Sequence, residues 1–122
     1  NEPKNAFVAA FIGESNIIDG IMNEDYMVTF AQKKFACLDK GFAQNEPVDV
    51  VVRPEDLRIV PPEEGQICGV VESVVFKGVH YEMKVHTETD TFMIQSTLAK
   101  NVNEEIGLRL MPDDIHIMHK TR

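Results

Sequence analysis

One segment of the sequence occurs twice, and this repeat constrains the fold more than any other feature. The first copy, VDVVVRPEDLRIV, covers residues 48–60, and the second copy, IGLRLMPDDIHIM, covers residues 106–118. Three aligned positions are identical and six more keep the size and polarity of the side chain. The identical pairs are Pro54 and Pro112, Asp56 and Asp114, and Ile59 and Ile117. The repeat indicates that the chain builds one local structure twice.

Each copy has the pattern of a strand, a corner and a second strand. Alternating apolar residues before the proline predict a strand with one buried face. Proline ends that strand because it has no backbone N–H to donate. The acidic pair that follows suits a tight turn or a single helical turn, in which an aspartate accepts backbone N–H bonds. We favour this role over catalysis, because catalytic carboxylates face each other across a cleft, whereas these follow a proline in two equivalent copies.

Short strand signals recur about every ten residues after residue 13, which is typical of a small barrel or sandwich. The segment PPEEG at 61–65 interrupts the series, because prolines and a glycine do not continue a ladder. The predicted strands are 16–22, 26–30, 34–38, 48–53 and 57–60, followed by 66–76, 79–86, 91–97, 106–111 and 115–120. Five short strands in each half fit a small, partly open barrel of the OB type. We therefore predict an all-β fold of two tandem OB-like five-stranded halves.

Residues 1–13 have a different pattern, because apolar residues recur there at helical spacing. These residues are Phe7, Val8, Phe11 and Ile12. We predict one short helix and interpret it as the end of a preceding domain, with a helix that packs on the following domain as the alternative. The expected organisation is thus a helix at 1–13, a first OB-like half at 14–60, a linker at 61–65 and a second half at 66–122. Since the first residue is not Met, we expect a longer parent chain.

The composition excludes several classes of function. The chain has 12 Lys and Arg against 20 Asp and Glu, a net charge of -8. Nucleic acids are bound chiefly by neutralising phosphates with Lys and Arg, so we predict no nucleic-acid partner. The longest apolar stretch, AFVAAFIG at residues 6–13, is far shorter than the roughly 20 residues that span a bilayer. Cys37 and Cys68 have no metal or redox spacing, and we interpret both as buried thiols in a reducing compartment.

No catalytic or metal-binding constellation emerges from the remaining residues. In VHYEMKVH, residues 79–86, histidines alternate with apolar residues, and Lys84 lies between possible ligands. A solvated outer face explains this pattern, so we predict no metal site. The glycines form no phosphate-binding loop, and we predict no cofactor and no catalytic residue within this chain. Gly41 and Gly78 lie in DKGF and FKGV, which we interpret as tight hairpin turns with a positive φ at glycine.

Two motifs resemble a known family. FVAAFIGESNI at residues 7–17, followed by VVRPEDLRIV at residues 51–60, is similar to the C-terminal region of ATP-binding subunits of ABC importers. That region is called the transport-associated OB, or TOBE, domain. FIGESN and VVFKGVHYEMKV at residues 74–85 resemble most the spermidine/putrescine group, with iron and sulfate importers similar in places. The resemblance runs over essentially the whole chain.

The resemblance implies a regulatory and structural domain that is not catalytic in isolation. It implies a parent ATPase that uses ATP and magnesium through Walker and signature motifs upstream of Asn1. The implied partners are the parent's own nucleotide-binding domain, the membrane permease subunits and a second copy of the parent, at the cytoplasmic face of the membrane. The candidate contact residues are Phe7, Phe11, Ile12, Glu14 and Arg53. The alternative is a small-ligand-sensing OB module, for a polyamine or an oxyanion, of an importer for another solute such as iron or sulfate.

Overall fold

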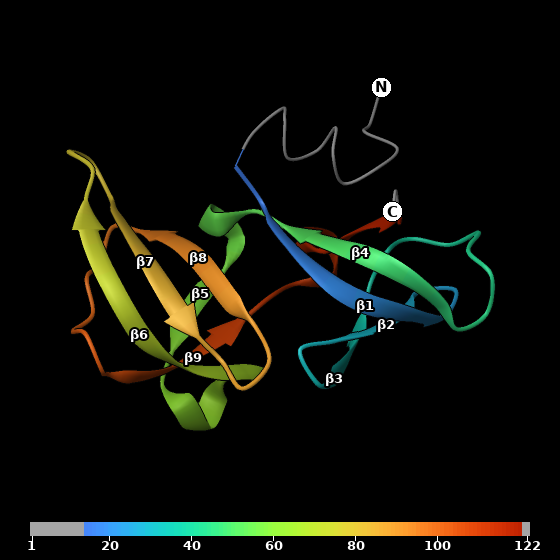
Figure 1. Ribbon diagram of the computed structural model, residues 1–122, viewed down its shortest axis with the longest axis horizontal. Helices are drawn as coiled ribbons and strands as arrows, with labels where there is room; N and C mark the ends of the chain where they lie inside the picture. Colours follow the sequence, from blue (N-terminus) through green and yellow to red (C-terminus); the bar gives the residue numbers. More distant parts are fainter. Residues whose placement is uncertain (1–13, 121–122) are drawn as a thin grey trace. The chain divides into compact units, whose positions relative to one another are not determined.

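Residues 14–120 fold into two antiparallel sheets of five strands each (Figure 1). The computed structural model describes residues 14–120, so the predicted helix at residues 1–13 lies outside the described residues. The strands are β1 (Asn16–Glu24), β2 (Met27–Phe30), β3 (Lys33–Ala36), β4 (Glu46–Val52), β5 (Arg58–Val60), β6 (Ile67–Phe76), β7 (Tyr81–His86), β8 (Thr91–Ser96), β9 (Glu105–Arg109) and β10 (His116–His119). Short 3-10 turns are η1 (Pro54–Asp56), η2 (Pro62–Glu64) and η3 (Pro112–Asp114). The prediction of an all-β fold with ten short strands is confirmed.

The two corners have the same structure, as the repeat predicts. In η1 the Asp56 N–H donates to the Arg53 carbonyl at 3.0 Å, and in η3 the Asp114 N–H donates to the Met111 carbonyl at 2.9 Å. The Asp114 carboxylate also accepts the Met111 N–H at 2.8 Å. Each proline therefore ends one strand and begins a single helical turn, which aims the next strand in a new direction.

The strand that follows each corner joins the sheet of the other half. The first sheet has the order β10-β4-β1-β2-β3, and the second has the order β5-β9-β6-β7-β8. Thus β5 leaves the first half and pairs with β9, with Ile59 opposite Leu108. In the same way β10 leaves the second half and pairs with β4, with Ile117 opposite Val50. The two halves exchange their last strands.

This exchange changes the boundaries of the compact units. One unit contains the residues up to Val52 and those from Met111 onward, and the other is Arg53–Leu110. The contiguous halves 14–60 and 66–122 that the sequence suggests therefore differ from the observed units, because each corner carries the chain from one unit into the other. The expected linker at 61–65 contains η2, which packs so closely on β9 that a Cβ at Gly107 would lie 2.8 Å from the Cα of Gly65.

Each unit has its own core, to which strands such as β1 and β6 contribute every second residue. In the first unit the rings of Phe30 and Phe35 stack with centroids 4.2 Å apart. Buried residues around them are Ile18, Met22, Val28, Val48, Val50, Val52, Ile115 and Ile117. The second core contains Leu57, Ile67, Val71, Met83, Val85, Phe92, Ile94, Ile106, Leu108 and Leu110. Ile115 and Ile117 reach the first core, and Leu57 the second, only because the last strands are exchanged.

Two smaller expectations need correction. Gly78 has φ +92° in the β6–β7 hairpin, as predicted, and Gly41 has φ +89°. Gly41, however, lies between β3 and β4, which are not neighbours in the sheet, so its turn is not a hairpin. Cys37 is buried and its pKa is raised by that burial. Cys68 is exposed, because strand alternation turns Ile67 inward and Cys68 outward.

Removal of residues 111–122 tests the strand exchange. We expect the shortened chain to lose protection from amide hydrogen exchange in β4 and β1, because Ile115 and Ile117 leave the first core. Residues 53–110 provide an internal control, because the strands of the second unit all lie within them. Protection kept in β4 and lost in β9 would contradict the exchange.

Candidate interaction site

The sequence-predicted contact residues fall in different parts of the chain. Phe7, Phe11 and Ile12 lie outside the described residues. Glu14 is exposed just before β1, in the first unit. Arg53 is exposed between β4 and η1, at the first position of the second unit. Both side chains are on the surface, and their role in binding stays a prediction.

Arg53 forms a local ion pair at the first corner. Its guanidinium lies 2.5 Å from the Glu55 carboxylate, and the two side chains are 59% and 38% exposed. An ion pair this exposed contributes little to stability. Met111 occupies the equivalent position of the second corner and is 48% exposed. The residue before the proline, which differs in chemistry between the two copies, is therefore on the surface in both.

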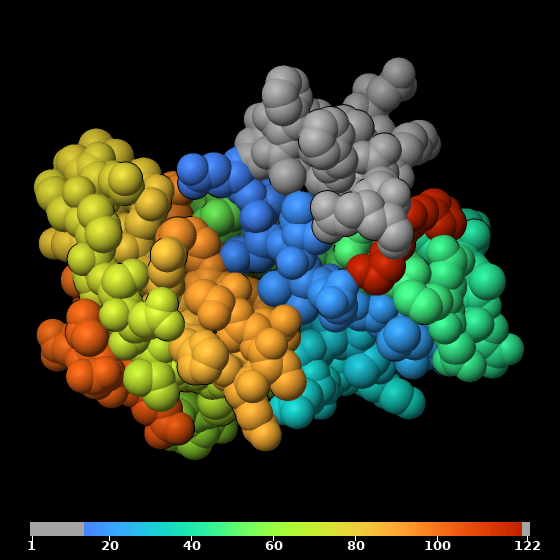
Figure 2. Space-filling view, viewed as in Figure 1, coloured from blue at the N-terminus to red at the C-terminus, as the bar shows by residue number. Residues whose placement is uncertain are grey.

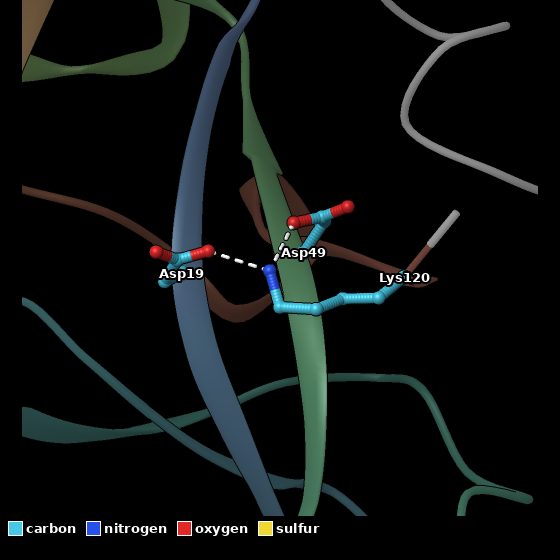
Figure 3. A network of polar contacts seen from close by, with 3 residues as sticks. All are labelled: Asp19, Asp49 and Lys120. Carbon is cyan, nitrogen blue, oxygen red and sulfur yellow. Dashed lines mark hydrogen bonds and ion pairs between the residues drawn. The ribbon is translucent and has the colours of Figure 1, made fainter. Parts of the chain in front are cut away.

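The outer face of the first sheet carries a more elaborate polar site. Asp19 of β1 and Asp49 of β4 are directly opposite each other in the antiparallel ladder. The ammonium of Lys120, just after β10, lies between them, 2.5 Å from Asp19 and 2.8 Å from Asp49 (Figure 3). Three strands that are far apart in sequence thus meet at one cation. We call Asp19, Asp49 and Lys120 the lysine clamp.

The clamp solves an electrostatic conflict. Like charges directly opposite each other on neighbouring strands are destabilising, and Asp49 is only 6% exposed. The single ammonium compensates the negative charge of both carboxylates. Its hydrogen bond to Asp19, followed in size of effect by the one to Asp49, raises the pKa of Lys120. The clamp therefore ties the residue after β10 to both β4 and β1.

A second set of contacts also holds β10 in place. The His119 ring lies 2.8 Å from the Glu46 carboxylate and packs on the Phe42 ring at 4.5 Å. The pKa of Glu46 is lowered, mainly by the hydrogen bond from the Ala43 N–H and to a smaller extent by the hydrogen bond with His119. The Asp39 carboxylate accepts the Ile117 N–H at 2.8 Å. Together with the clamp, these contacts hold the exchanged strand at Ile117, His119 and Lys120.

Partly exposed apolar side chains flank the clamp on β1. Ile17 is 39% exposed and Ile21 is 38% exposed, and both point to the same face as Asp19. Among residues 14–120 there is no group of three or more His, Cys, Asp or Glu that could hold a metal ion. No helix in this part of the chain is long and apolar enough to span a membrane.

The sequence contains a signal for the clamp that pattern reading missed. NIIDGIM and EPVDVVV each place one aspartate inside an apolar strand. A carboxylate in such a position needs a cation nearby. The cation lies 101 residues from Asp19 in sequence, so spacing alone could not identify it.

Comparison with known proteins identifies the family. The family described as "TOBE domain" matches residues 50–118, which contain both corners. The chain belongs to the TOBE domain family.

Curated relatives resemble the whole of this TOBE domain chain. The spermidine/putrescine import ATP-binding protein PotA of Desulfitobacterium hafniense is 58% identical over 122 residues, which are 100% of this chain and 35% of the relative. The proteins of the same name from Clostridium novyi and Clostridioides difficile are 58% and 54% identical over 120 residues. The chain thus spans about a third of the length of these relatives, 35% in each case.

One solved structure supports the fold of the TOBE domain. The cytoplasmic molybdate-binding protein ModG superposes with a TM-score of 0.72, covering 85% of this chain and 95% of ModG. Its sequence identity is 11%, so the likeness concerns the fold alone.

Replacement of the clamp cation tests its role in the TOBE domain. We expect Lys120→Met to lower the free energy of unfolding by about 1–3 kcal/mol, because it removes two charge-assisted hydrogen bonds and leaves Asp49 without its cation. Urea denaturation measures the loss, and Lys33→Met on the exposed edge strand is the matched control. Adding Asp49→Asn to Lys120→Met should restore part of the stability. Equal effects of the two lysine variants would exclude the clamp.

The clamp also predicts a pH dependence. The folded-state pKa of Lys120 is raised, so its contribution is complete below the unfolded value of about 10.4 and is lost as the pH rises through the folded value. The stability difference between wild type and Lys120→Met should therefore stay constant in neutral solution and shrink only above about pH 10. A difference that shrinks on acidification to about pH 6 would point to another group.

Proposed function

We propose that this TOBE domain is the C-terminal part of the ATP-binding subunit of an ABC importer for polyamines. The observation that carries the proposal is identity of 58% over the entire chain to spermidine/putrescine import ATP-binding proteins. In that subunit ATP and magnesium are bound by the part of the protein outside this chain. The permease subunits hold the assembly at the cytoplasmic face of the membrane.

Within the subunit, the domain acts as a regulatory and structural module that couples or stabilises the ATPase dimer. The fold is consistent with this role. Each unit includes a strand from the other half of the chain, so the two units are linked by shared strands as well as by the backbone. Partly exposed apolar groups on β1 and an exposed corner at Arg53 offer protein-binding surface. The domain is non-catalytic in isolation.

Two measurements separate the parts of this proposal. The purified chain should neither bind nor hydrolyse ATP, whereas the parent subunit should do both. Deletion of the domain from the parent should weaken subunit dimerisation and uptake of spermidine into reconstituted vesicles. ATP turnover by the chain alone would contradict the non-catalytic role. Unchanged dimerisation and transport after the deletion would contradict the coupling role.

A second candidate function is a sensor of small ligands, and the lysine clamp favours a polyamine as that ligand. The clamp shows that two carboxylates on this sheet can hold one ammonium, and the chain carries a net charge of -8. Isothermal titration of the chain with spermidine tests this function. Binding that persists at physiological salt and is lost in Asp19→Asn would support a sensor. Heat that disappears with salt would reduce the interaction to general charge attraction.

A further inference from the structure

Strand β6 is paired on both sides for only part of its length. Strand β7 accompanies it from Val70 to Phe76, but β9 pairs only with Ile67–Val70. Backbone bonds from Val71 to Asn103 and Glu104 extend that contact by one residue. From Ser73 to Phe76, the ladders of the described residues reach β6 only from the β7 side. The β6–β7 hairpin forms a projection from its sheet, drawn in yellow (Figures 1 and 2).

The backbone groups along this open edge can be assigned from the ladder. The Lys77 N–H donates to the His80 carbonyl at 2.8 Å, so this pair is hydrogen-bonded. Pairs alternate in an antiparallel ladder between hydrogen-bonded and non-hydrogen-bonded. Phe76 and Val74 are therefore in non-hydrogen-bonded pairs with β7, and their N–H and C=O groups point to the open edge.

The side chains of this edge favour pairing with another strand. Residues 73–76, SVVF, carry no charge and no proline. Val75 is 49% exposed and Phe76 is 59% exposed, and valine and phenylalanine are common in strands. Natural proteins protect such edges with charges, prolines or covering groups.

Other edges of this chain have that protection. At the β10 edge, the Asp39 carboxylate accepts the Ile117 N–H. The β3 edge carries Lys33 and Lys34, and β5 has only three residues. The fourth edge strand, β8, has no charged residue, but it is in contact with η1. Among the residues the structure describes, segment 73–76 has neither a charge nor a covering carboxylate.

We propose that segment 73–76 of β6 is the interface through which two copies of this chain pair, antiparallel, around a two-fold axis at Val75. This proposal rests on the proposed function, because it names the face that would join two domains of an ATPase dimer. In this register Val74 is opposite the partner's Phe76, and the two exchange both backbone hydrogen bonds. The symmetric pair doubles this to four bonds, and valine–aromatic cross-strand pairs add packing.

Charge distribution favours a second copy over an unrelated strand. In this register Ser73 is opposite the partner's Lys77, and Glu72 is opposite the partner's Gly78, so no like charges face each other. Elsewhere the net charge of -8 makes two copies repel. Two copies of this segment can therefore meet without charge repulsion, whereas elsewhere the net negative charge of the chain repels a second copy. Since the ladder is short, the isolated chain should associate weakly and in a concentration-dependent way.

Sedimentation velocity of the complete chain, over about a hundredfold range of concentration up to about 1 mM, tests the proposal. Wild type should shift from monomer to dimer, and Val75→Lys should remain monomeric, because two lysines would face each other at the axis. Val70→Lys is the matched control, since Val70 lies on the same strand and exposed face but is paired on both sides. It should dimerise like wild type.

A second variant tests the backbone contacts directly. Phe76→Pro removes an N–H that points to the open edge and is not needed by β7, so it should keep the circular dichroism of wild type and prevent dimerisation. A monomeric wild type at every concentration would overturn the proposal, as would dimerisation of Val75→Lys equal to that of Val70→Lys. A folded Phe76→Pro that dimerises like wild type would also overturn it.

The outcomes are separable from those of the proposed function. If Val75→Lys blocks dimerisation of the chain but leaves ATPase and transport of the parent unchanged, the interface stands and the coupling role fails. If deletion of the domain abolishes transport while the chain stays monomeric, the coupling role stands and this interface is wrong.

Discussion

The reciprocal exchange of β5 and β10 is the constraint on which the rest of the structure depends. Each unit contains four strands from one half and receives its fifth from the other. The two proline corners make this possible, because each follows the last strand of one half, β4 or β9, and starts a short strand that completes the other unit. The lysine clamp and the contacts of Asp39 and His119 then fix β10 to the sheet of the first unit. Neither unit has a complete core without a strand from the other half, so folding of the two is coupled.

The repeat acquires a clear physical meaning from this exchange. Pro54 and Asp56 perform the same task as Pro112 and Asp114, since in both corners the aspartate N–H closes a turn onto the residue before the proline. The residues before the prolines, Arg53 and Met111, are both exposed and differ in chemistry. The common residues build the turn in both corners, and the role of Arg53 in binding stays a prediction.

Much of the fold could be predicted from the sequence, and the reason is local. Period-two alternation identified all ten strands with ends within two residues of those observed. Alternation states which face of a strand is buried but not which strand lies beside it, so the exchange of Ile59 and Ile117 between units could not be derived. Site residues were harder still. Lys120 and Asp19 are 101 residues apart, and only the completed sheet brings them together. The open edge at residues 73–76 likewise becomes visible only once the ends of β9 are known.

The exchanged strands β5 and β10 join the two units, and nuclear Overhauser contacts between backbone and side-chain protons measure this most directly. We expect contacts between Ile117 and Val50 and between Ile59 and Leu108, because these residues are directly opposite each other in their ladders. Contacts of Ile59 with strands of residues 14–52, and of Ile117 with strands of residues 66–109, would instead show two self-contained halves and would contradict the exchange.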